Sequence, residues 1–460
     1  MGDKSGRVNM HSILTAVSNK PVGSVKNHPL TGMDHAMGRH TLHMVFYYEK
    51  TSFGSFSIDP VRESLSETLS LYPPVTGRLT RVESGNWEVK CNDAGVRVLR
   101  SRVGVTIDEW LRSADGSEER DLMVWEDMPD SPTRVTTWSP FRVQINDFEG
   151  GGVAIGMSCN HMNADPTCLT LLLKSWTEVH RHQPIAYPPS FLLPAAPLGS
   201  RLVPVNRTKS TSYLADKSQE AAAAQAPSVK MASATFKFSD SIIKQCLSEI
   251  RDKCPHATPF DFLAALFWTR VVSLKKPRHD HTHTLSICVD FRRLLQEPLP
   301  YGYFGNALNF SLLSVNGEEM ECGGLGHAAE LVHRHVSDLK EDEFWSAIHL
   351  LESQKNEGGG KYAPPCTMYG PELTCVSMEH MIVGHQSMIY STIFDSVRPV
   401  HVSCHVGNVE GEGLILVMPS AEEGLARTVM VTLPEEEMDI LCKDQAILCL
   451  EPKLLLTGKL

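Results

Sequence analysis

The chain has 460 residues, of which 42% are hydrophobic and 21% are charged, and its formal net charge is −11 at pH 7. This is an ordinary globular composition, and the length predicts about two to three domains. The longest apolar runs fall far short of the roughly 20 residues that cross a bilayer, and no long basic run is present. We therefore expect neither a transmembrane segment nor a nucleic-acid partner.

The 12 cysteines are scattered without a C-x-x-C pair, and the first residues lack the apolar core of a secretory signal. This pattern is typical of reduced thiols in the cytosol rather than of a disulfide framework. We expect a cytoplasmic protein whose contact with a membrane, where it has one, is peripheral.

The first 190 residues mix short strands with helical stretches. Residues 42–48 (LHMVFYY) predict a strand, and residues 57–72 (SIDPVRESLSETLSLY) predict a helix because apolar residues recur at helical spacing after a Ser/Asp start. Two further short strands are expected at 87–92 and 95–101. This mixture predicts a layered α/β or α+β domain.

The composition changes at residues 191–232, which are rich in Pro, Ala, Ser and Lys and show no sustained period. We interpret them as a crossover linker between an N-terminal domain (1–190) and a C-terminal domain (233–460). The tract 216–225 (DKSQEAAAAQ) predicts only a short helix that would fray in water.

The second half repeats the mixture of strands and helices without a literal sequence repeat. A strand is expected at 233–239, followed by a helix capped by Ser239 or Asp240. A second helix is expected at 258–274, with Thr258 as N-cap and proline at its first position. Later elements are three strands and a helix start: 284–291, 402–406, 413–419 and 432–441.

Three familiar motifs are incomplete in this chain. Ser158 lacks the second glycine of a nucleophile elbow because position 160 is asparagine, and the GGGK run at 358–361 lacks the Ser/Thr of a phosphate-binding loop. A dinucleotide fingerprint fails because position 155 is isoleucine. These departures exclude serine hydrolase, P-loop and Rossmann interpretations.

Three alternating histidines, His279, His281 and His283, would share one face of a strand and could there chelate a transition metal. No cluster of Cys or Glu lies nearby, so a solvated loop is the favoured interpretation. We predict no metal site.

His161 and Asp165 lie between a glycine-containing apolar strand and an apolar helix that begins near Pro166. The end of a strand before a helix is where α/β folds place ligands. A neutral imidazole there could act as a general base, and Asp165 could orient the ring or brace the loop through an arginine. From these residues alone, catalysis and a buried structural histidine both stay open.

The surrounding motifs resemble those of a known family. The segments that carry the resemblance, in chain order, are LSLYPPVTGRL (69–79), CNDAGV (91–96), GGVAIGMSCNHMNAD (151–165), TPFDFLAALFW (258–268) and VDFRRLLQEPLPYGYFGNA (289–307). Together they resemble the plant BAHD acyltransferases from about Pro29 to Met438, outside the linker. H-x-x-x-D is weak alone, but is specific when joined to Y-F-G-N-A.

The resemblance implies a fold and a chemistry. The fold would be two chloramphenicol-acetyltransferase-like α/β domains with mixed sheets and a channel between them. His161 would be the general base that takes the proton of an acceptor as it attacks an acyl-CoA thioester. Asp165 would be structural and paired with Arg292 of VDFR, and acyl-CoA would be a substrate or ligand, with no bound cofactor. The residues that contact CoA are not identified.

Two departures from the family pattern are similar to one branch, the ECERIFERUM/Glossy-type wax proteins. Pro166 stands where the family has glycine, and FDSVRP (394–399) replaces the usual D-F-G-W-G segment. Members of this branch are associated with the fatty-acid elongase of the endoplasmic reticulum, where they act with its condensing enzyme, a 3-ketoacyl-CoA synthase.

Two functions from different classes remain open. The first is an accessory protein that promotes extension of very-long-chain acyl-CoAs towards cuticular wax, attached to the endoplasmic reticulum through the condensing enzyme. The second is a conventional acyltransferase that moves an acyl group to a hydroxyl or amine of a small metabolite, with His161 as base.

Overall fold

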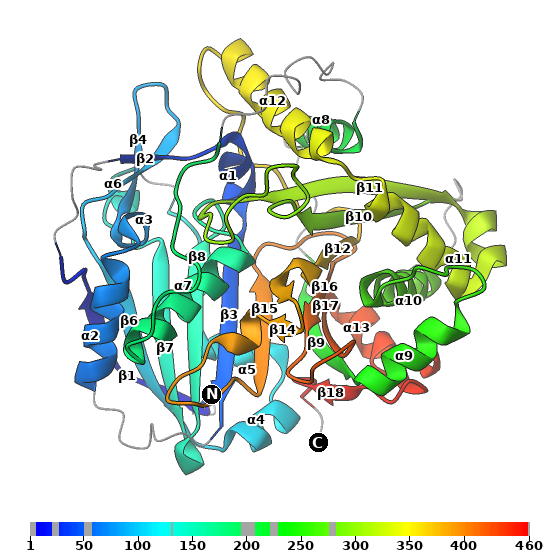
Figure 1. Ribbon diagram of the computed structural model, residues 1–460, viewed down its shortest axis with the longest axis horizontal. Coiled ribbons are helices and arrows are strands. Elements are labelled where there is room, and N and C mark those ends of the chain that lie inside the picture. Colours follow the sequence, from blue (N-terminus) through cyan, green and yellow to red (C-terminus); the bar gives the residue numbers. More distant parts are fainter. Residues whose placement is uncertain are drawn as a thin grey trace.

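The computed structural model describes residues 6–20, 27–49, 58–129, 132–194, 208–220, 229–275 and 282–458, and its chain builds two large mixed β-sheets with helices packed on them (Figure 1). Both sheets combine parallel and antiparallel pairs. The predicted fold class, α/β with mixed sheets, is confirmed.

The first sheet has six strands in the order β1-β6-β7-β8-β3-β15. Only β6 and β7 pair in parallel. The strands are β1 (Val8–Ala16), β6 (Val96–Val103), β7 (Phe141–Phe148), β8 (Val153–Asn160), β3 (Thr41–Tyr48) and β15 (His401–Val406). Helices α2 (Ile58–Leu69) and α7 (Pro166–His180) cover one face and share its apolar core (Figure 1).

The second sheet has seven strands in the order β11-β10-β12-β16-β17-β9-β18. The strand β12 (Thr374–Ser377) pairs in parallel with β10 (Thr282–Asp290) and β16 (Leu414–Pro419), and the other pairs are antiparallel. The remaining strands are β11 (Leu308–Asn316), β17 (Arg427–Pro434), β9 (Met231–Phe238) and β18 (Lys453–Leu455). The helices that share its core include α9 (Asp240–Glu249), α10 (Pro259–Leu274), α11 (Gly317–Ser337) and α13 (Glu435–Leu441).

Shorter elements complete the fold. Strands β2 (Asn27–Pro29), β5 (Trp87–Lys90) and β4 (Arg78–Arg81) form a three-stranded sheet, and β13 (Ile382–Val383) and β14 (Gln386–Ser387) form a hairpin. The other helical segments are α1 (Gly32–Ala36), η1 (Met37–Arg39), α3 (Pro73–Thr76), α4 (Ile107–Ser113), α5 (Gly116–Glu119), η3 (Arg120–Leu122), α6 (Pro132–Val135), η4 (Glu149–Gly151), α8 (Lys209–Glu220), α12 (Glu341–Glu357), η6 (Glu379–Met381), η7 (Ile389–Ser391) and α14 (Gln445–Leu448).

Helix α10 shows why local sequence predicts its own boundaries. The hydroxyl of Thr258 accepts a hydrogen bond from the backbone N–H of Asp261, and the Asp261 carboxylate accepts one from the N–H of Thr258. This capping box, with Pro259 at the first helical position, satisfies donors that would otherwise be unpaired. The predicted N-cap and helix span are confirmed.

Strand β15 (His401–Val406) comes from the second half of the chain and pairs with β3 at the edge of the first sheet. The two halves therefore share a sheet, and the boundaries expected at 190 and 232 stay a prediction. Of the expected linker, 195–207 and 221–228 lie outside the described residues. Helix α8 (Lys209–Glu220) lies between these segments and packs beside α12 (Figure 1).

The sequence predicts neither a metal site nor a transmembrane segment. His279 and His281 lie outside the described residues, and His283 lies on β10. Within the described ranges, no group of three or more His, Cys, Asp or Glu side chains is arranged to hold a metal ion. The helices in this same part of the chain are all too short or too polar to cross a membrane.

Gly156 of β8 lies close to the backbone of η3, and this contact can be tested by substitution. A Cβ added at Gly156 would lie 2.2 Å from the carbonyl oxygen of Leu122, whereas one added at Gly104 meets nothing within 4 Å. We expect Gly156→Ala to lower the free energy of unfolding by about 1–3 kcal/mol because a backbone must shift. Urea unfolding should show little change for Gly104→Ala, and equal midpoints for the two variants would contradict this account.

Candidate active site

His161 is held in a turn between β8 and α7 by backbone contacts from another part of the chain. Its N–H donates to the carbonyl of His40 at 2.9 Å. The side chain of Asn160 ties down both sides of the turn, donating to Gly38 O at 3.2 Å and accepting from Met162 N at 3.0 Å. The backbone of His161 is therefore held in place by the hydrogen bonds of the turn.

The imidazole of His161 is fully buried, with none of the residue exposed. Burial lowers the pKa of His161, against the opposing effects of Asp165 and of nearby backbone carbonyls, so the ring is neutral near pH 7. Its Nε2 lies 3.0 Å from the hydroxyl oxygen of Tyr369, which is a hydrogen-bond distance. A neutral imidazole has the protonation state that a general base needs.

Asp165 caps helix α7, and all of its hydrogen bonds lead away from His161. Its carboxylate accepts from the backbone N–H groups of Cys168 at 3.0 Å and Ala307 at 3.1 Å, and lies 2.7 Å from Nη1 of Arg292. Burial acts to raise the pKa of Asp165, but Arg292 and these donors outweigh it and hold the pKa below its usual value. Of the two roles expected for Asp165, this geometry favours bracing over orienting the ring.

Arg292 is fully buried and joins three segments. Besides Asp165, its guanidinium contacts Asp290 at the end of β10 and donates to the carbonyls of Tyr303 at 3.0 Å and Gly305 at 2.9 Å. The expected partners Asp165 and Arg292 thus lie in contact, and the Y-F-G-N-A block lies directly beside them.

Two residues of the site escaped sequence reasoning. Asn306 of the Y-F-G-N-A block donates from Nδ2 to the carbonyl of His161 at 2.8 Å and to Asp34 Oδ1 at 2.8 Å. Asn306 was within a quoted motif, so its place there could have suggested a role. Tyr369 lies in no motif, and nothing in its local sequence indicates that it meets His161.

The segment FDSVRP folds into a tight turn despite its missing glycines. Phe394 and Val397 exchange backbone hydrogen bonds around Asp395 and Ser396, which adopt φ of 43° and 79°. Phe394 is buried against Tyr48 and packs edge-on against its ring. These contacts indicate a structural role for the segment in this chain.

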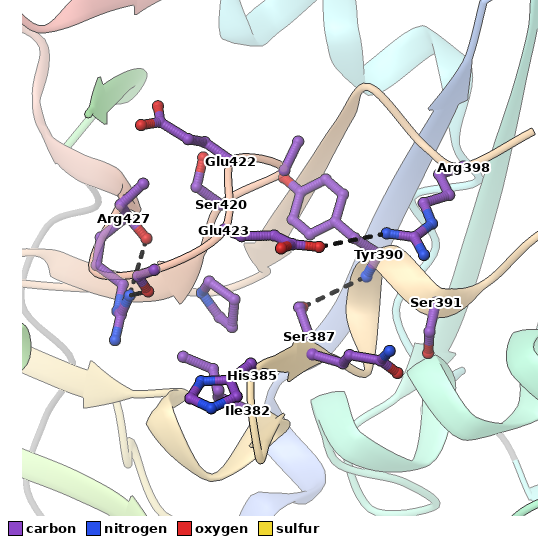
Figure 2. A pocket seen from close by; sticks show the side chains of 15 residues that line it. Ile382, His385, Ser387, Tyr390, Ser391, Arg398, Ser420, Glu422, Glu423 and Arg427 are labelled. Carbon is purple, nitrogen blue, oxygen red and sulfur yellow. Dashed lines mark hydrogen bonds and ion pairs between the residues drawn. The ribbon is translucent and has the colours of Figure 1, made fainter. Parts of the chain in front are cut away.

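A surface cavity includes Arg398 of this segment in its lining (Figure 2). His161 is not among the residues that line it. Its two arginines are paired, Arg398 at 3.8 Å from Glu423 and Arg427 at 2.5 Å from Glu379. This cavity therefore offers no unpaired guanidinium, and the candidate chemistry lies elsewhere.

The buried ion pair between Asp165 and Arg292 predicts a large stability effect. Arg292→Met would leave the carboxylates of Asp165 and Asp290 buried without their cation, and we expect a loss of about 3–5 kcal/mol in unfolding free energy. A matched control is Arg112→Met, because Arg112 and Asp108 form an exposed pair, with 60% and 62% of their side chains accessible. Exposed pairs contribute about 0–1 kcal/mol, so thermal unfolding should separate the two variants clearly.

The ion pair between Asp165 and Arg292 also makes the free energy of unfolding depend on pH. Because the pKa of Asp165 is lowered in the folded state, its stabilisation is present above the unfolded carboxyl pKa of about 3.9 and is lost as pH falls through the folded value. In Arg292→Met the carboxyls of Asp165 and Asp290 lose their cation and take up protons at a higher pH than in wild type, so the stability gap between the two proteins should narrow as the pH falls. A gap that is constant down to pH 2 would contradict the pairing.

Comparisons with known proteins give the family. The model of the Transferase family matches residues 12–448. Hydroxycinnamoyltransferase 1 of Oryza sativa subsp. japonica is 26% identical over 397 residues, which are 84% of this chain and 86% of that protein. Protein ECERIFERUM 26-like of Arabidopsis thaliana is 25% identical over 439 residues, which are 95% of this chain and 94% of that protein.

Solved structures share the fold. Vinorine synthase superposes with a TM-score of 0.70 at 19% identity, covering 96% of this chain and 98% of its own. TRI101 of F. graminearum, complexed with coenzyme A and deoxynivalenol, superposes with a TM-score of 0.67 at 14% identity, covering 93% and 99%. With a family model that spans nearly the whole chain, this protein belongs to the Transferase family, that of the plant BAHD acyltransferases.

Proposed function

We propose that this chain binds acyl-CoA and promotes the elongation of very-long-chain acyl-CoAs together with a condensing enzyme, without acyl transfer at His161. Attachment to the endoplasmic reticulum would be through that enzyme, a 3-ketoacyl-CoA synthase. Acyl-CoA binding is supported by family membership and by the coenzyme A in the TRI101 complex.

The observation that carries the proposal is the contact between His161 and Tyr369. A general base must reach the acceptor proton from about 2.6–3.2 Å. At Nε2 of His161 that distance is already taken by the Tyr369 hydroxyl, at 3.0 Å, in a fully buried setting. The ECERIFERUM 26-like relative, the loss of D-F-G-W-G and Pro166 after Asp165 favour the same branch.

A second candidate is an acyl-CoA-dependent acyltransferase, favoured by the neutral imidazole of His161 and its intact support by Asn306 and Asp165. The acceptor's proton would go to Nε2, its oxygen or nitrogen would bond to the thioester carbonyl carbon, and the carbon–sulfur bond would break. The departing thiolate would take the proton from His161, which restores the neutral ring. Asp165 and Arg292 would serve as positioning residues in this reaction.

The first experiment measures elongation. When the chain is co-expressed with a condensing enzyme in cells that make long-chain acyl-CoAs, we expect His161→Ala to leave the longest products at wild-type level, because elongation does not use the base. His256→Ala, at an exposed position, is the matched control. If His161→Ala abolishes the longest products while remaining folded and abundant, the accessory proposal fails.

The second experiment measures acyl transfer directly. We expect purified wild-type protein to release no free CoA from a very-long-chain acyl-CoA in the presence of a panel of alcohols and amines, because Nε2 is occupied. Titration of the liberated thiol checks this. Release that falls by about 10²–10⁴-fold in His161→Ala, the usual loss on removing a general base, would establish the second candidate instead.

A further inference from the structure

We propose that Tyr369 keeps acceptors away from His161: its phenol occupies the position on Nε2 that an acceptor hydroxyl would need. Substrate hydroxyls are excluded as long as Tyr369 stays in place. The proposal concerns the occupancy of His161, and it rests on the proposed acyl-CoA binding only for the second of its two measurements.

The geometry of the pair matches an acceptor bound to a base. The Tyr369 oxygen lies 3.0 Å from Nε2, and the two rings are nearly parallel, with an interplanar angle of 28° and centroids 5.9 Å apart. Both residues are almost completely buried, at 0% and 1% exposed. Because Nε2 can make one hydrogen bond along its ring plane, a second hydroxyl cannot reach it at the same time.

The Tyr369 ring is wedged between neighbours from both halves of the chain. It packs edge-on against His40 at 4.9 Å and Phe310 at 5.5 Å between ring centroids. Burial raises the pKa of Tyr369, so the phenol keeps its proton. A neutral hydroxyl therefore contacts a neutral imidazole, and neither group gains hydration of a charge by moving towards water.

The backbone on both sides of Tyr369 is fixed by helix α8 and by His40. Tyr213 of α8 donates from its hydroxyl to Met368 O at 3.0 Å, and Lys217 of α8 donates to Gly370 O at 2.5 Å. The N–H of Met368 donates to Nε2 of His40 at 3.0 Å. These contacts fix the backbone that carries the Tyr369 side chain, so α8 helps to keep the phenol on His161.

Removal of the ring should create a site of predictable shape. Truncation of a buried aromatic side chain leaves an apolar cavity, and such cavities bind small aromatic molecules that match the lost group. In Tyr369→Ala, added phenol would refill the cavity with its hydroxyl at Nε2. The phenol proton would pass to His161, the phenol oxygen would bond to the thioester carbonyl carbon, and CoA would leave as the thiol. The product would be a phenyl ester.

The first measurement needs no substrate. Diethyl pyrocarbonate acylates accessible neutral imidazoles, and peptide mass spectrometry locates the modified ring. We expect His161 to be protected in wild type and modified about tenfold faster or more in Tyr369→Ala, because loss of the ring that covers Nε2 lets the reagent reach it. Tyr369→Phe, which keeps the ring but loses the hydroxyl, is the matched control and should stay closer to wild type. Equal modification of His161 in wild type and Tyr369→Ala would overturn the proposal.

The second measurement uses stearoyl-CoA and phenol. We expect free CoA and phenyl stearate from Tyr369→Ala and from neither wild type nor Tyr369→Phe. If Tyr369→Ala does not fold, Tyr213→Phe and Lys217→Met, which loosen the α8 contacts, should raise the modification rate of His161, and unchanged rates in both would overturn the proposal. Calorimetric titration of wild type with stearoyl-CoA tests the proposed function separately, since its failure would leave the occupancy of His161 untouched.

Discussion

The guanidinium of Arg292 is the charge around which the candidate site is built. A buried cation must be balanced, and Arg292 meets this requirement with Asp165, Asp290 and two carbonyls of the Y-F-G-N-A block. Those partners belong to the start of α7, the end of β10 and the loop before β11. Because one side chain fixes all three, the turn that carries His161 cannot shift without exposing or unpairing a buried charge.

Helices and strands were predicted from the sequence where neighbouring residues alone determine their boundaries. Helix α10 was predicted to its first residue because Thr258 as N-cap and Pro259 at the first position mark its start, and β3 and β8 were predicted from their apolar runs. The place of β15 in the first sheet was not predictable in this way. Its pairing with β3 joins residues more than 350 positions apart, and such a register leaves no periodicity in either strand.

The residues of the candidate site also fall into those that local motifs revealed and one that they did not. His161 and Asp165 were found because they lie in one motif, and Arg292 because the family resemblance supplied it. Tyr369 was missed because it comes from a loop more than 200 residues downstream, whose backbone is held in place by α8 and His40. A sequence pattern can therefore indicate a candidate base and the residues that support it, but not which distant side chain contacts that candidate.

The loss of the D-F-G-W-G motif has little effect on the structure around the candidate site. The FDSVRP turn keeps its backbone hydrogen bonds and its buried phenylalanine although Asp395 and Ser396 adopt a conformation that glycine favours. The fold therefore tolerates the departure, and the Asp165–Arg292 pair is intact. On the proposed function, an accessory protein differs from an acyltransferase here by the Tyr369 hydroxyl on His161 and not by the loss of a support. The backbone beside Tyr369 is held by α8, and His161 is held by the turn after β8. On the proposed function, the activity of the chain therefore depends on how these two distant segments meet.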